Sequence, residues 1–71
     1  MKVKDIEKII SSATTAALYV ADSRADAVSE KGQRVGYFYR DAELGEYWAD
    51  LEVAYIYPVR KDDLNVWAIR K

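Results

Sequence analysis

The chain has 71 residues, of which 51% are hydrophobic and 32% are charged, and its formal net charge is -1. This length gives one small domain, residues 1–71, with room for a single thin core, and the apolar content excludes intrinsic disorder. The near-neutral charge excludes a general binder of phosphate backbones and leaves open only a local basic patch.

Two residue types that serve many enzymes are missing. The chain has no histidine and no cysteine, so it lacks the usual general base near neutral pH, the Ser–His and Cys–His pairs and the commonest metal ligands. We therefore expect no enzymatic activity, no metal and no cofactor. No apolar run reaches the roughly 20 residues that span a bilayer, and the first residues lack the layout of a signal peptide. We expect a cytoplasmic protein without a membrane partner.

The first expected element is a helix from Val3 to Ala13. Within it Val3, Ile6, Ile10 and Ala13 recur at the spacing of one helical face, which predicts a helix that buries this face. The hydroxyl-rich residues 11–15 follow, and their side chains compete for backbone hydrogen bonds. The helix is therefore expected to end there.

The next expected element is a strand from Thr15 to Ala21. Both alternating sets of its side chains are apolar, which is typical of a central strand. Residues 22–33 mix charged and small side chains and predict a long connection. A brief helical turn within it is the alternative, carried by Ala25, Ala27 and Val28.

A second strand is expected from Arg34 to Arg40, where the side chains alternate with a period of two. The alternation would place Val35, Tyr37 and Tyr39 on one side and Gly36 and Phe38 on the other. A short helix then follows from Asp41 to Trp48, because Asp41 is a suitable N-cap and Glu43 complements the helix dipole.

Two further strands, Leu51 to Val59 and Leu64 to Arg70, form a hairpin around the polar turn 60–63. The expected order is therefore helix, strand, strand, helix, strand, strand. We predict an α+β fold in which the N-terminal helix packs on a three- to four-stranded antiparallel sheet.

One candidate surface is acidic and aromatic. Between residues 41 and 59 the chain carries five acidic residues, three tyrosines, one tryptophan and no lysine or arginine. Such a surface suits a basic partner protein, because complementary charge steers association and aromatic side chains anchor interfaces. The alternative is that the acids serve solubility and the rings are buried. The candidate partner-binding residues are Asp41, Glu43, Glu46, Tyr47, Asp50 and Glu52.

A second candidate surface is the strand from Arg34 to Arg40. Aromatic rings beside arginines on an exposed sheet face are typical of modules on which nucleic-acid bases stack. The register does not fit the RNA-recognition motif, because Val35 separates Arg34 from Gly36. The alternative is that tyrosines simply suit a half-buried strand. The candidate nucleic-acid-binding residues are Arg34, Tyr37, Tyr39 and Arg40, with Phe38 toward the core.

The two ends of the chain carry a resemblance. The segments Met1 to Ile10, Asp50 to Pro58 and Leu64 to Ile69 resemble very short proteins of unknown function encoded in phages and prophages of Gram-positive bacteria. The resemblance implies an accessory phage protein and assigns no functional residue.

Three hypotheses for the function follow. The first is a non-enzymatic protein-binding module, which the resemblance extends to a phage-encoded modulator of a host factor. The second is a binder of single-stranded nucleic acid. The third is a homodimer formed through exposed aromatic side chains or an uncovered strand edge.

Overall fold

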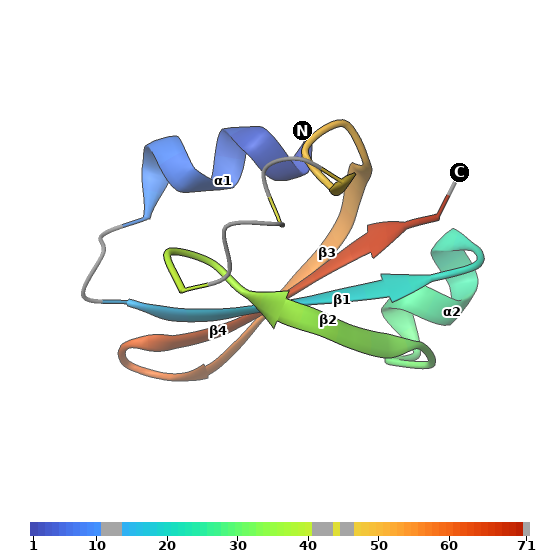
Figure 1. Ribbon diagram of the computed structural model, residues 1–71. Coiled ribbons are helices and arrows are strands. Elements are labelled where there is room, and N and C mark those ends of the chain that lie inside the picture. Colours follow the sequence, from blue (N-terminus) through green and yellow to red (C-terminus); the bar gives the residue numbers. More distant parts are fainter. Residues whose placement is uncertain (11–13, 41–43, 45–46, 71) are drawn as a thin grey trace.

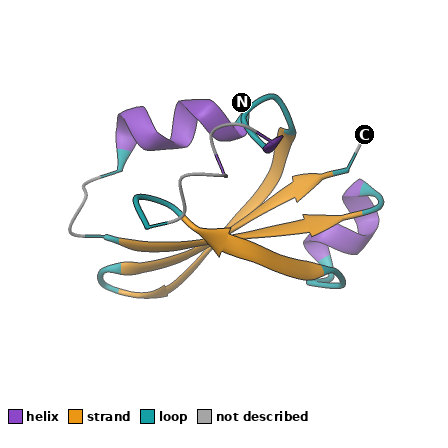
Figure 2. Ribbon diagram, viewed as in Figure 1, coloured by secondary structure: helices purple, strands orange, loops and turns teal. Residues whose placement is uncertain are grey.

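The fold is a small α+β arrangement of two short helices and a four-stranded sheet, seen in a computed structural model that describes residues 1–10, 14–40, 44 and 47–70. The elements follow in the order α1 (Val3–Ile9), β1 (Thr15–Ala21), α2 (Arg24–Val28), β2 (Gln33–Tyr37), β3 (Glu52–Arg60) and β4 (Asp63–Ile69). Helix α1 runs along the upper side of the sheet, and α2 lies at one end of it (Figure 1). The sheet separates the two helices (Figure 2).

The strands lie in the order β2-β1-β4-β3. The outer pairs β1/β2 and β3/β4 are antiparallel, but the central pair β1/β4 is parallel, with Thr15 opposite Asp63 and Ala21 opposite Ile69. The expected antiparallel sheet is therefore wrong at its centre, and the sheet is mixed. A parallel arrangement needs a connection that crosses from one end of the sheet to the other. Residues 38–51, between β2 and β3, are long enough to make that crossing.

Helix α1 begins at Val3 as expected but is shorter than predicted. It ends at Ile9, and Ile10 already has an extended backbone with φ -110° and ψ 148°. Its first N–H groups have partners outside the helix: those of Val3 and Lys4 donate to the carbonyl oxygens of Leu51 and Ala49, each at 2.9 Å. These bonds satisfy donors that a helix start leaves free and fix α1 to the segment that leads into β3.

The order of the helices was predicted only in part. Helix α2 occupies the predicted connection after β1, where a helical turn was the alternative, and the Ser23 hydroxyl caps it by accepting from the Asp26 N–H at 3.2 Å. The helix predicted from Asp41 to Trp48 falls largely outside the described residues. Within that range the Trp48 N–H donates to the Leu44 carbonyl oxygen at 3.1 Å.

The main core lies between α1 and the sheet. Its largest fully buried side chains are Val3, Ile6, Leu18, Val20 and Val66. Because side chains alternate along a strand, Leu18, Val20 and Val66 define one face of β1 and β4, which we call the covered face. Among the described elements, α2 packs on the opposite face of the same strands, at one end of it. No helix in the part of the chain that the structure describes covers the rest of that face (Figure 1).

Candidate functional site

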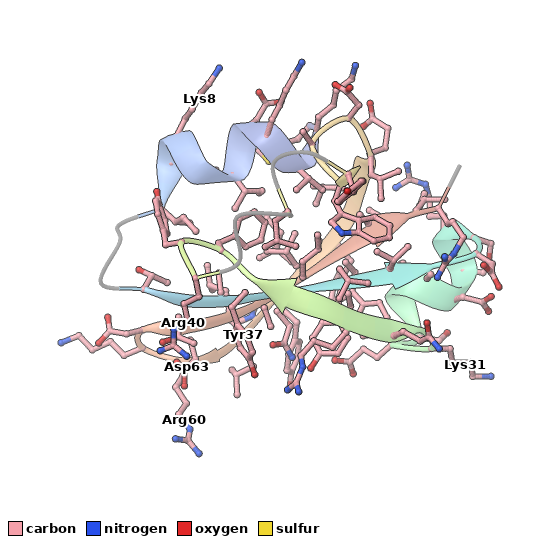
Figure 3. All side chains as sticks on the ribbon, viewed as in Figure 1. Lys8, Lys31, Tyr37, Arg40, Arg60 and Asp63 are labelled. Atoms are coloured by element: carbon pink, nitrogen blue, oxygen red, sulfur yellow. The ribbon has the colours of Figure 1, made fainter. Side chains whose placement is uncertain are left out.

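The open face is the side of the sheet opposite α1. The parallel register of β1 and β4 places their side chains on it in facing pairs: Thr15 with Asp63, Ala17 with Asn65, and Tyr19 with Trp67. Figure 3 shows Tyr37, Arg40, Arg60 and Asp63 projecting on this side, whereas Lys8 projects from α1 in the opposite direction. The open face therefore combines aromatic, polar and arginine side chains.

A β-bulge places Arg34 and Tyr37 on the same side of the sheet. Residues three apart in a regular strand lie on opposite faces. Here Gly36 pairs with Leu18 and Arg34 with Tyr19, so Val35 is an extra residue without a partner in β1. An extra residue of this kind reverses the alternation beyond it. Val35 packs against the covered-face core, and Arg34 and Tyr37 both belong to the open face.

Tyr37 is the centre of an aromatic and basic cluster. The Arg34 and Arg40 guanidinium carbons lie 5.1 and 5.5 Å from the centroid of its ring, which is the range of cation–π attraction. Arg34 also donates from Nη1 to the Tyr37 hydroxyl oxygen at 2.8 Å. These contacts hold the ring in one orientation and keep two positive charges beside it.

A pocket of 230 Å³ opens on the sheet beside Tyr37. Thr15 and Ala17 of β1 and Asp63 and Asn65 of β4 line it, together with the Tyr37 ring. The space of the pocket exists because Ala17 has a small side chain between the larger side chains of Thr15 and Tyr19. The pocket therefore brings a hydroxyl, a carboxylate and an amide next to an aromatic ring.

The other end of the open face is closed. The rings of Tyr19 and Trp67 stack with their centroids 4.5 Å apart, and Trp67 packs against Ala27 of α2. Gly32 lies so close to this stack that a Cβ there would meet the Val20 carbonyl oxygen and the Trp67 ring. The Trp67 Nε1 is buried without a hydrogen-bond partner. This end is a second small core, and the accessible part of the face lies toward Tyr37.

The predicted nucleic-acid-binding residues are only partly brought together. Arg34, Tyr37 and Arg40 form the cluster described above, and Phe38 is buried in the core, as expected. Tyr39 lies beyond the end of β2 with a φ of 67°, and its hydroxyl donates to the Ile10 carbonyl oxygen at 3.0 Å. The expectation that Val35 and Tyr39 share a side with Tyr37 is wrong, because of the bulge and the end of the strand.

The acidic aromatic surface is only partly described. Asp41, Glu43 and Glu46 lie outside the described residues. Tyr47 is 66% exposed. The remaining two acids have cationic neighbours that their sequence surroundings did not suggest: Asp50 Oδ1 lies 3.3 Å from Lys4 Nζ, and Glu52 Oε2 lies 3.4 Å from the N-terminal nitrogen of Met1.

Sequence reasoning did not single out the polar residues of the pocket. Asp63 was assigned to a turn, Asn65 to an ordinary strand and Thr15 to a strand end. Counting back by two from Trp67 along β4 gives Asn65 and Asp63 on one face, which is a usable signal. Thr15 could not be added to them, because the parallel pairing of β1 with β4 leaves no local mark in the sequence.

The chain matches no family model, no curated protein and no solved structure. Across the described ranges, no group of three acidic side chains could hold a metal ion. None of the helices that the structure describes is long and apolar enough to cross a bilayer. The function is therefore inferred from the geometry of the open face.

Proposed function

We propose that the protein binds single-stranded nucleic acid through the open face of its sheet. The observation that carries this proposal is the Tyr37 ring on an uncovered face, with the Arg34 and Arg40 guanidinium groups 5.1 and 5.5 Å from its centroid. Bases stack on aromatic rings whatever their sequence, and arginine binds phosphate in a bidentate manner. A single strand is favoured over a duplex because its bases are free to reach the ring.

The charge distribution supports a local rather than a general attraction. The net charge is -1, but Arg40 and Arg60 project on the same side of the sheet as Tyr37 (Figure 3). Arg34 of β2, Arg40 just after β2 and Arg60 of β3 would hold the phosphates on both sides of the pocket. Each phosphate contact on a single strand contributes a slope of roughly -0.7 to the dependence of log K on log salt.

A protein-binding module, including a phage-encoded modulator of a host factor, ranks second. The exposed ring of Tyr47 favours it. Against it, the acids Asp50 and Glu52 each have a cation within 3.4 Å, which reduces the net negative field that would attract a basic partner.

Pairing of two copies through strand edges ranks third. Both edge strands are irregular: β2 has its bulge at Val35, and β3 carries Pro58 and has register shifts between Val53 and Tyr55 and between Pro58 and Arg60. Bulges and proline are common means by which proteins keep sheet edges from pairing. A homodimer would therefore have to use another surface.

The test of the proposed function is fluorescence anisotropy with short labelled single strands of RNA and DNA, titrated at several salt concentrations. Replacing Arg34 and Arg40 with glutamine should weaken binding and lower the magnitude of the salt slope by roughly 1.4, because two phosphate contacts are lost. The matched control replaces Lys8 and Lys31 with glutamine. This control makes the same change in net charge at exposed positions away from the pocket (Figure 3).

A second pair of variants separates stacking from charge. Tyr37→Leu should weaken binding roughly tenfold, which is the loss expected for one stacked base. Tyr39→Leu, two residues away but bonded to the end of α1, should leave the affinity unchanged. Equal losses in both variants, or no binding of any oligonucleotide at low salt, would refute the proposed function.

A further inference from the structure

The pocket beside Tyr37 has the size of a site for one small ring. Its volume of 230 Å³ is below the roughly 300 to 1,000 Å³ of typical ligand sites. The Tyr37 ring and the small side chain of its cross-strand partner Ala17 both line it. A base that leaves the nucleic-acid strand could lie against Tyr37 while its phosphates stay near the arginines.

The polar groups of the pocket have a definite order. Asp63 and Asn65 are two positions apart on β4 and share one face, so they are about 7 Å apart along the strand. The Asp63 carboxylate only accepts hydrogen bonds, whereas the Asn65 amide both donates and accepts. A base lying on this strand would therefore meet an acceptor at one end of its edge and a donor at the other.

Guanine has the edge that matches this order. Its N1–H and N2–H groups are adjacent donors, which one carboxylate can accept together, and its O6 is an acceptor for an amide N–H. Adenine and cytosine each present one amino group next to an acceptor nitrogen, and uracil presents one N–H between two carbonyl oxygens. We propose that the pocket binds one base of the single strand and selects guanine through Asp63 and Asn65. This inference rests on the proposed function.

A cationic ligand fits the pocket less well. An aromatic ring beside a carboxylate also suits a methylated ammonium group. Here the Arg34 and Arg40 guanidinium groups already lie near the Tyr37 ring, and like charges placed together repel. Charge complementarity therefore favours a neutral base attached to anionic phosphates.

The experiment compares labelled oligoadenylates that carry one central guanosine, inosine or adenosine. Guanosine should bind roughly tenfold tighter than adenosine, as expected for a bidentate contact to one base. Inosine differs from guanosine only in lacking the 2-amino group, so the oligonucleotide with inosine should lose most of the preference over adenosine. This comparison uses the unaltered protein, and its outcome does not depend on whether a variant folds.

The matched variants are Asp63→Asn and Asp62→Asn. Both remove one negative charge from the same hairpin, but Asp62 is exposed and does not line the pocket. General affinity for the strand should rise equally in the two variants, whereas only Asp63→Asn should lose the preference for guanosine.

The outcomes separate this inference from the proposed function. Equal binding of the three oligonucleotides would overturn guanine selection and leave single-strand binding intact. A preference that survives Asp63→Asn would remove Asp63 from the role given to it, and displacement of the strand by trimethyl-lysine would assign the pocket to a cation instead. Failure of every oligonucleotide to bind would overturn both proposals.

Discussion

The two faces of the sheet are built by the same strands and differ in what fills them. On the covered face, β1 and β4 supply Leu18, Val20 and Val66, each no more than 1% exposed. On the open face three facing pairs of β1 and β4 carry small, polar or aromatic side chains, namely Thr15/Asp63, Ala17/Asn65 and Tyr19/Trp67, and Tyr57 of β3 is 41% exposed. Both alternating sets of β1 are apolar, so apolar content alone does not tell the faces apart. Polar side chains do distinguish the faces: none of the described polar residues is buried in the core, whereas Thr15, Asp63 and Asn65 lie on the open face.

The largest expected effect tests whether the covered face carries the stability. Leu18→Ala should lower the free energy of unfolding by about 2 to 5 kcal/mol, because it leaves a cavity in the core. Tyr57→Ala on the open face should cost about 1 kcal/mol or less, since it removes a half-exposed ring that stacks on Tyr55 with the centroids 6.3 Å apart. Urea unfolding followed by circular dichroism measures both. Similar losses would show that the two faces do not divide stability and binding in this way.

A smaller effect tests the closed end of the open face, under α2. Gly32→Ala should destabilise the protein by about 1 to 3 kcal/mol, because the added Cβ overlaps the Val20 carbonyl oxygen and the Trp67 ring in a packed region. The near-ultraviolet circular dichroism of the Tyr19–Trp67 stack should change with it. Gln33→Ala, at the next and exposed position, is the control. An unchanged spectrum in Gly32→Ala would mean that this end is not packed as described.

The smallest effect concerns the start of α1, which lies over the covered face. The Lys2 N–H donates to Asp5 Oδ2 at 3.0 Å, and this bond lowers the pKa of Asp5 below its ordinary value of 3.8. A lowered pKa in the folded state gives stabilisation that is present above the ordinary pKa and is lost as the pH falls through the lowered one.

The pH dependence is read from thermal unfolding of the protein and of Asp5→Asn. The wild type should be the more stable at neutral pH, and the difference should shrink below pH 3.8. Asp22→Asn, whose exposed carboxylate pairs with Arg70 outside α1, serves as the comparison. A difference that stays constant with pH would mean that the Asp5 carboxylate does not cap the helix.

Local sequence patterns predicted the strands better than their arrangement. The bounds of β1 and its central place follow from its two apolar sets, and the β3/β4 hairpin follows from a polar turn between two alternating runs. The parallel pairing of β1 with β4 depends instead on a crossing connection, and no local pattern encodes the direction of strands far apart in the chain.

The candidate site was predicted in part for the same reason. Arg34, Tyr37 and Arg40 were recognised from composition and period. The bulge at Val35 could not be predicted, because it leaves no mark in the composition of the segment or in its alternating sequence pattern. It changes the side on which Val35 lies relative to Tyr37, whereas Tyr39 was misplaced because β2 already ends at Tyr37. The pocket residues Asp63 and Thr15 come together only through long-range pairing.

The parallel pair at the centre of the sheet also sets an order for assembly. On its inner side, β1 (residues 15–21) pairs with β4 (residues 63–69). Contacts between such distant segments slow folding, because a large loop must close first. On the ribosome, β1 would remain without its central partner until β4 has left the exit tunnel. The domain should therefore fold late and as one unit, after synthesis has passed its final strand.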